Sequence, residues 1–333
     1  MTDVFDCLPA LPDGFFNIDI SNIREVFPRP ALIQIPGDNP QALFVTILQH
    51  GNEYTGLTVM QRVLQKYDKL PRSVILFVGN VRAAEANRRL LPDQEDYNRC
   101  WPGTLREASE TTGMMQRVFE LANEQDLFAA IDIHNNTGRN PHYACVTDVN
   151  MQNRNLAAHF NKVAMVMNRK GVSTMAFDGI CPAVTLECGM PGDPDGIEHA
   201  CRFLEDLLVM EAIPDKKPTR EELHLVVSHA MLNIPDEVSF AFDPEADADL
   251  LFDTDFESRN FTLLDPNQVF GYTRIERPLA ITDEQGLDIT DATMRVDDGR
   301  IYLNYTMMPA MITRNQEVVR QDCLCYLLQD YSG

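Results

Sequence analysis

Continuous apolar runs alternate with helix-like patterns through the first two-thirds of this chain. The runs "ALFVTILQ", "SVILFVGN", "FAAIDIH" and "AVTLECG" are apolar almost throughout, which is typical of strands buried on both faces. Between them, apolar residues recur at helical spacing in residues 58–67, 104–125, 151–170 and 196–211. Gly171 is the expected end of the third helix. This alternation predicts an α/β layer built on a largely parallel sheet.

The pattern changes near residue 213. The segment "EAIPDKKPTREE" at 211–222 is charged and contains two prolines, which is typical of a linker. Beyond it, short strand-like runs such as "LHLVVSHAML" and "RIYLNYTMM" are separated by acidic turns rich in Gly and Asp. We therefore expect one domain over residues 1–213 and a smaller β-rich domain over residues 220–333.

The composition restricts the partners and the compartment. The chain of 333 residues carries 28 basic and 50 acidic residues, a net charge of −22. Because nucleic acids and anionic membranes attract basic surfaces, we expect neither as a partner. The eight cysteines have no CxxC spacing and are expected to be reduced and mostly buried. Without a signal-peptide pattern or a membrane-length apolar run, the sequence predicts a soluble, cytoplasmic protein and leaves homo-oligomerisation open.

Polar residues lie at or near the ends of the predicted buried strands. They are His50, Asn80, His134 and Glu187. In open α/β sheets, functional residues gather beyond the carboxyl ends of the strands. A single histidine in such a place is more often a hydrogen-bonded structural residue. The combination of four strand ends therefore favours a shared site more than any one residue does.

A metal site is the best interpretation of three of these positions. His50, Glu53 and His134 are two histidines and a glutamate, the ligands of one class of catalytic zinc site that keeps a fourth position for water. A tight turn at Gly51 can direct His50 and Glu53 to one point. Asp132 points to the same side of its strand as His134 and would orient a ligand histidine. The alternatives are a carboxylate at a helix start for Glu53 and a structural buried polar residue for Asp132.

Four motifs occur in a consistent order between residues 43 and 190. They are "HGNE", "GNVRAAEANRRLLPDQEDYNR", "DIHNNTG" and "VTLECG". Together they resemble the succinylglutamate desuccinylase/aspartoacylase branch of the zinc carboxypeptidase superfamily. The resemblance implies a three-layer α/β/α sandwich with a mixed sheet, carrying one Zn2+ ion, and a smaller β-rich C-terminal domain that partly covers the active site.

The resemblance also assigns the central residues. His50, Glu53 and His134 resemble the zinc ligands of the family. Glu187 in "LECG" resembles the catalytic glutamate, which acts as general base on water activated by the metal.

Residues that meet the substrate are assigned in the same way. Arg89 resembles the arginine that stabilises the scissile carbonyl, and Arg88 competes for this role because a short insertion follows. Asn98 and Arg99 in "DYNR" resemble the pair that holds the free carboxylate of the substrate. His142 is a further candidate for substrate contact, and its alternative is a structural histidine between a loop and a strand. The late tyrosine of the family has two candidates, Tyr272 and Tyr305.

The residue types suit amide hydrolysis of an anionic substrate. Zinc polarises a carbonyl and lowers the pKa of its water toward ~7. A nearby glutamate can transfer that proton to the leaving nitrogen, and arginines can stabilise the oxyanion and bind a carboxylate. The stretch 82–106 holds five arginines and no lysine in a chain of net charge −22. This cluster suggests a small anionic substrate, and the alternative is a solvated helix face.

Three functions are compatible with these features. The first is hydrolysis of an amide bond next to a free carboxylate, in an N-acyl amino acid. The second is a carboxypeptidase that trims peptide C-termini with the same zinc, glutamate and arginine set, which would need a less covered pocket. The third is a non-catalytic relative, which is disfavoured because all three ligands and Glu187 are present.

Overall fold

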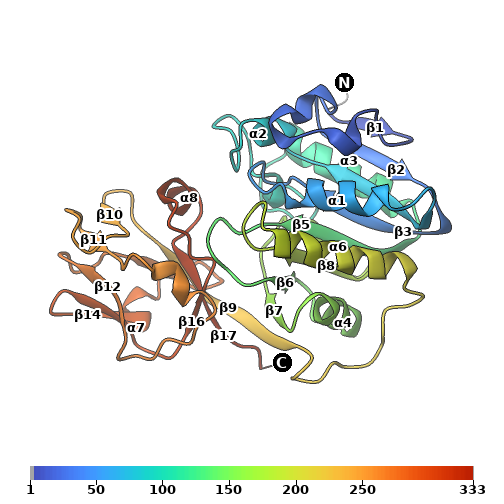
Figure 1. Cartoon of the computed structure of the whole chain (residues 1–333). Coiled ribbons are helices and arrows are strands. Elements are labelled where there is room, and N and C mark those ends of the chain that lie inside the picture. The colour runs from blue at the N-terminus through green and yellow to red at the C-terminus, as the bar shows by residue number, and fades with distance from the viewer. Residues whose placement is uncertain (1–3, 333) are drawn as a thin grey trace. The chain divides into compact units, whose positions relative to one another are not determined.

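The computed structural model describes residues 4–332 (Figure 1). They divide into two compact units. The first unit runs up to Asn135 and continues with His142–His224, and the second comprises Asn136–Pro141 and the chain from Leu225 onward. Residues 136–141 thus directly follow the first unit in sequence yet belong to the second. The predicted role of the C-terminal domain in covering the active site stays a prediction.

The first unit is built on a mixed sheet with the strand order β1-β2-β4-β3-β5-β8-β6-β7. The strands are β1 (Asp6–Leu8), β2 (Ala31–Ile35), β3 (Gly37–Ile47), β4 (Leu70–Val78), β5 (Leu127–His134), β6 (Tyr143–Val146), β7 (Val163–Val166) and β8 (Ala183–Glu187). Strand β3 is parallel to both β4 and β5, and β5 is parallel to β8. Strand β2 is antiparallel to β4, and β6 is antiparallel to β8. The four apolar runs of the sequence are therefore the adjacent parallel strands β4, β3, β5 and β8.

Helices cover both faces of this sheet (Figure 1). They are α1 (Thr55–Gln65), α2 (Val81–Glu85), α3 (Glu110–Asn123), α4 (Met151–Phe160), α5 (Ser173–Ala176) and α6 (Pro194–Val209). On one face, Met115 and Val118 of α3 share a buried cluster with Phe44 and Phe77 of the sheet. Helices α1 and α4 each pack against α6, and α1 lies so close to β3 that a Cβ on Gly56 would be 2.7 Å from the Ile47 side chain. The three-layer α/β/α sandwich with a mixed sheet is confirmed.

Two predicted helices were too long. Helix α3 starts at Glu110 rather than near residue 104, because the Ser109 hydroxyl accepts the Thr112 N–H at 3.1 Å and caps the first turn. Helix α4 ends at Phe160 rather than at Gly171, because Asn161 is extended and the next residues form β7, parallel to β6. The prediction that the helix continues through Val163–Val166 is wrong, because these residues form β7.

The second unit is rich in short strands, as expected for the C-terminal part of the fold class. One set of antiparallel strands comprises β9 (His224–Asn233), β13 (Ala280–Thr282), β16 (Met308–Ala310) and β17 (Cys325–Asp330). A further sheet comprises β10 (Phe240–Ala241), β11 (Leu250–Leu251), β12 (Val269–Thr273), β14 (Met294–Asp297) and β15 (Arg300–Leu303). The short helix α7 (Thr290–Thr293) directly precedes β14 in the chain, and α8 (Gln316–Gln321) lies between β16 and β17. Aromatic residues such as Phe252, Phe256 and Phe270 fill its core. Among residues 4–332, no helix has the length and apolar character that crossing a membrane requires.

Candidate active site

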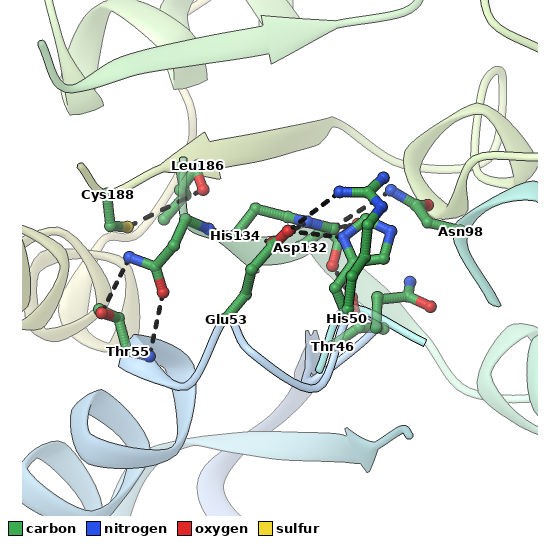
Figure 2. Close-up of polar contacts among 12 residues, drawn as sticks. Thr46, His50, Glu53, Thr55, Asn98, Asp132, His134, Leu186 and Cys188 are labelled. Carbon is green, nitrogen blue, oxygen red and sulfur yellow. Dashed lines mark hydrogen bonds and ion pairs between the residues drawn. The ribbon is translucent and has the colours of Figure 1, made fainter. Parts of the chain in front are cut away.

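The carboxyl ends of β3 and β5 bring the three predicted metal ligands together. His50 follows β3, Glu53 directly precedes the first turn of α1, and His134 is the last residue of β5. One ligand atom from each residue lies within 4.8 Å of the other two, and all three residues are buried. Glu53 is central, with Oε1 2.8 Å from His50 Nδ1 and Oε2 2.7 Å from His134 Nδ1 (Figure 2).

A tight turn after β3 directs His50 and Glu53 to this point. Leu48 has a positive φ of 57°, a conformation that is strained for a residue with a branched side chain. The Leu48 carbonyl accepts the Asn80 N–H at 2.6 Å, which holds the strained turn in place. At Gly51 a Cβ would lie 2.2 Å from the backbone of Ala83, so only glycine fits where the turn passes α2.

Each histidine of the centre has a carboxylate on its second ring nitrogen. Asp96 Oδ1 is 3.0 Å from His50 Nε2, and Asp132 Oδ2 is 2.8 Å from His134 Nε2. The Ser173 hydroxyl in turn donates to Asp132 Oδ2 at 2.5 Å, and the Thr46 hydroxyl donates to Oδ1 of the same carboxylate. Carboxylates in this position fix the ring orientation, leaving both Nδ1 atoms facing Glu53.

The sequence predicts that Asp132 orients a ligand histidine, but the same role of Asp96 was not predicted. The available signal was its place in "DYNR", directly ahead of two candidate substrate residues. Asp96 Oδ1 accepts the backbone N–H of Asn98 at 2.9 Å, so the same carboxylate shapes the turn that carries that residue.

The electrostatics of the centre suit a cation. Burial alone would raise the pKa of Glu53, but the two imidazoles against it hold that pKa well below its usual range. Burial lowers the pKa of His134, but Asp132 and Glu53 raise it well above the ordinary histidine value. The His134 imidazole thus holds a proton that a divalent cation would displace on binding. Two imidazole nitrogens and one carboxylate are a donor set that fits a metal ion of the zinc type.

Glu187 lies beside the metal-ligand group. It is the last residue of β8 and the register partner of His134 across the β5–β8 pair. Its carboxyl group is buried, and burial raises its pKa to about 8. A buried carboxyl group with a raised pKa beside candidate metal ligands is a candidate for proton transfer.

Arg89 lies at the same centre. Its guanidinium donates to Glu53 Oε1 at 3.4 Å and to Asp96 Oδ2 at 3.5 Å, and its side chain is 12% exposed. Arg88, the competing candidate, is exposed. The geometry therefore favours Arg89 as the arginine nearest to the metal ligands.

The turn that carries Asn98 and Arg99 reaches the opposite side of His134. Asn98 is buried, with Nδ2 3.3 Å from His134 Nε2 and Oδ1 accepting the Ser173 N–H at 3.0 Å. Arg99 is half-buried, and its guanidinium donates to the Asn98 carbonyl at 2.6 Å.

Asn80 and His142 are held by other contacts. Asn80 caps α2 through the Ala83 N–H at 3.1 Å and exchanges hydrogen bonds with Gln94, so its polar groups serve local structure. The His142 ring stacks on His199 at 5.3 Å, and its Nε2 is 3.9 Å from Asp193 Oδ2 at the start of α6. The expected substrate contact of His142 stays a prediction.

The predicted arginine cluster is dispersed. Arg82 is exposed and pairs with Asp93 at 3.0 Å, and Arg106 is also exposed. Of the five arginines in residues 82–106, Arg89 and Arg99 are the two placed at the centre by these contacts. Tyr272 lies in β12 and Tyr305 is 57% exposed, both in the second unit, and their roles stay predictions.

Residues 41–190 match the family model described as the succinylglutamate desuccinylase/aspartoacylase catalytic domain. This segment belongs to that family. The match contains every candidate ligand and catalytic residue named above, in the order in which the motifs occur. The family consists of hydrolases that act on amide bonds.

Solved structures share the fold over most of the chain. The succinylglutamate desuccinylase of Vibrio parahaemolyticus is 13% identical, with a TM-score of 0.59 over 90% of this chain and 86% of that one. The succinylglutamate desuccinylase/aspartoacylase of Rhodobacter sphaeroides is 15% identical, with a TM-score of 0.60 over 90% and 88%. Murine aminoacylase 3 is 14% identical, with a TM-score of 0.53 over 88% and 96%. Among curated protein sequences there is no match.

Proposed function

We propose that this chain is a zinc-dependent hydrolase that cleaves the amide bond of an N-acyl amino acid, next to a free carboxylate. The observation that carries the proposal is the convergence of His50, Glu53 and His134 within 4.8 Å. Glu187 and Arg89 beside that group add the proton-transferring and cationic side chains that amide hydrolysis needs. The family of residues 41–190 and the deacylases among the fold relatives support the same reaction class.

The side chains divide the work of hydrolysis among them. His50, Glu53 and His134 would hold the metal, which when bound supplies Lewis acidity for the scissile carbonyl and lowers the pKa of water. Glu187 would take a proton from the attacking water and return it to the leaving nitrogen, because its buried carboxyl lies at the end of β8 as the register partner of His134. Arg89 is positioned to stabilise the negative charge that develops on the carbonyl oxygen.

Arg99 and Asn98 are the proposed carboxylate-binding pair. A guanidinium can form a two-pronged hydrogen bond with a carboxylate, and the Asn98 amide lies 3.3 Å from His134, at the centre itself. We propose a small anionic substrate on this ground and assign no role to the exposed Arg82 and Arg106. A cytoplasmic location is proposed as well, since Cys145 and Cys188 are buried thiols.

The test is amine release by the zinc-loaded protein. N-acetyl- and N-succinyl-amino acids are compared with C-terminal dipeptides and blocked peptides, and Glu187→Gln serves as the control. Turnover of the acyl amino acids that is lost in Glu187→Gln supports the proposal. Turnover of the peptides alone would make the protein a carboxypeptidase. Unchanged turnover in Glu187→Gln would remove Glu187 from the mechanism.

A further inference from the structure

A buried asparagine next to a metal ligand connects the two halves of the proposed site. Asn135 directly follows His134 at the end of β5 and is 4% exposed. Its amide makes three hydrogen bonds, two of them to Thr55. Because the amide oxygen and nitrogen are both engaged, only one orientation of this side chain satisfies its partners.

The first connection runs to the start of α1. The Thr55 N–H donates to Asn135 Oδ1 at 3.1 Å, and Asn135 Nδ2 donates to the Thr55 hydroxyl at 2.9 Å. The residue before the helix, Tyr54, makes no side-chain cap. Asn135, just after β5, therefore supplies the hydrogen-bond acceptor that the first turn of α1 lacks. Since Glu53 precedes this helix by two residues, the contact fixes the backbone that carries a metal ligand.

The second connection runs to the ligand itself. The Asn135 backbone N–H donates to Glu53 Oε2 at 3.1 Å. This is the carboxylate oxygen that also faces His134 Nδ1. The same residue thus holds both the backbone near Glu53 and the direction of its carboxylate.

The third connection runs to the loop after β8. Asn135 Nδ2 donates to the Gly189 carbonyl at 2.9 Å, two residues beyond Glu187. Gly189 has a positive φ of 71°, so this loop takes a sharp turn directly after the proposed base. The Cys188 N–H donates to the His134 carbonyl at 3.0 Å, which joins the same two segments through the backbone.

We infer that Asn135 is a positioning residue that sets Glu53 and Glu187 relative to each other. The inference rests on the proposed function for its catalytic meaning, but its effect on the metal ligand is independent of any substrate. Partners behind metal ligands commonly change metal affinity by ~10–100-fold when they are removed. Asn135 holds Glu53 through its side-chain amide and its backbone N–H, whereas His50 and His134 are each held by a carboxylate.

The test compares Asn135→Ala with Asn153→Ala, a control in α4 that contacts the first residue of β8, the end of that strand away from Glu187. Asn153 is also buried, and its Oδ1 accepts the N–H of Ala183, the first residue of β8. Zinc affinity is measured by competition with a chromogenic chelator, and thermal stability by circular dichroism. We expect both alanine variants to lower Tm, whereas only Asn135→Ala weakens zinc binding, by ~10–100-fold. Equal zinc affinities in Asn135→Ala and the parent would overturn the inference.

A milder variant covers the case in which Asn135→Ala does not fold. Thr55→Val removes one acceptor of the amide and leaves the bond to Gly189, so a smaller loss of zinc affinity is expected, and no loss would contradict the inference. In an active parent, kcat should fall while KM stays within about twofold, because Asn135 acts through Glu53 and Glu187. If the parent has no deacylase activity, the proposed function fails while the affinity comparison still tests Asn135.

Discussion

At the scale of single residues, two carboxylates support the proposed metal ligands from behind without being ligands themselves. Asp96 and Asp132 each bind the outer nitrogen of one histidine at 3.0 and 2.8 Å. Both are charged neighbours that hold a ring in one tautomer and raise its basicity. Their effect on metal binding should therefore be separable from the effect of the ligands themselves.

Replacing either carboxylate by its amide should weaken metal binding without preventing it. Asp96→Asn and Asp132→Asn keep the shape of the side chain but lose the negative charge that supports the imidazole. We expect zinc affinity to fall by ~10–100-fold in each, measured by chelator competition. Asp178→Asn, far from these contacts in sequence, is the control and should bind zinc as the parent does. Loss of all zinc binding in Asp96→Asn would mean that Asp96 is itself a ligand.

Asp178 should make stability depend on pH. Burial raises its pKa to about 6, although the Thr147 hydroxyl donates to it at 2.9 Å. Because the folded protein binds this proton more tightly than the unfolded chain, the stabilisation is full below pH ~4 and is lost as pH rises through about 6.

The Asp178→Asn protein lacks this titration. The Tm of the variant minus that of the parent should therefore increase from pH 4 to pH 7. Thermal melts at constant ionic strength measure this difference. A difference in Tm that stays constant across this range would show that Asp178 does not titrate with a raised pKa.

Most of the centre was predictable because its residues occupy strand ends and motifs. His50, Glu53 and His134 were predicted from residue type and place alone, and the structure brings them together. Asn135 was not predicted as a positioning residue, because its partners Thr55 and Gly189 are far away in sequence and only the folded chain brings them near. Hydrogen bonds of this kind leave no local pattern to recognise.

At the scale of elements, the four apolar runs predicted β3, β4, β5 and β8 because strands buried on both faces need continuous apolar sequence. The short strands were harder to predict. Strand β7 has only the four residues Val163–Val166 and follows α4 with almost no turn signal. Its pairing with β6 decides its conformation, and that pairing is not visible in sequence.

Two glycines in helices should respond oppositely to the same substitution. In α1, an alanine at Gly56 would place Cβ 2.7 Å from Ile47 Cγ2 and 2.9 Å from Ile47 Cβ, so helix and sheet must separate. We expect Gly56→Ala to destabilise the protein by ~1–3 kcal/mol through overpacking. In α3, Gly113 is exposed and its Cβ would meet nothing within 4 Å. Gly113→Ala should therefore stabilise by about 0.5–1 kcal/mol.

Urea denaturation of the two variants measures both effects. A stabilised Gly56→Ala protein would mean that α1 does not approach β3 as closely as the structure has it. A destabilised Gly113→Ala protein would point to a contact of Gly113 beyond its own helix.

At the scale of the whole chain, the net charge has the same sign as the proposed substrate. The net charge is −22, yet the proposed substrate is an anion. In the proposed function, Arg89 and Arg99 would attract the substrate locally, because a guanidinium in contact with an anion outweighs distant surface carboxylates that salt screens beyond ~8–10 Å. The acid excess therefore bears on solubility and sets no limit on the charge of a small substrate.

The division into two units should be visible in calorimetry. All three candidate ligands lie in the first unit, whereas Phe252 lies in the core of the second, with its ring centroid 4.4 Å from that of Phe256. Since a ligand stabilises only the structure that binds it, removing the metal should lower the transition of the first unit. Phe252→Ala, which leaves a cavity worth ~3–5 kcal/mol, should lower the transition of the second.

The two perturbations should therefore act on different transitions in a scan with and without chelator. Zinc affinity of Phe252→Ala measured at 25 °C, well below either transition, should equal that of the parent, because no ligand contact is changed. A single transition shifted by both perturbations would mean that the units unfold as one cooperative body. In that case destabilising the second unit would also lower the fraction of folded, metal-binding protein near Tm. The stability of the β-rich unit would then contribute to the stability of the metal site.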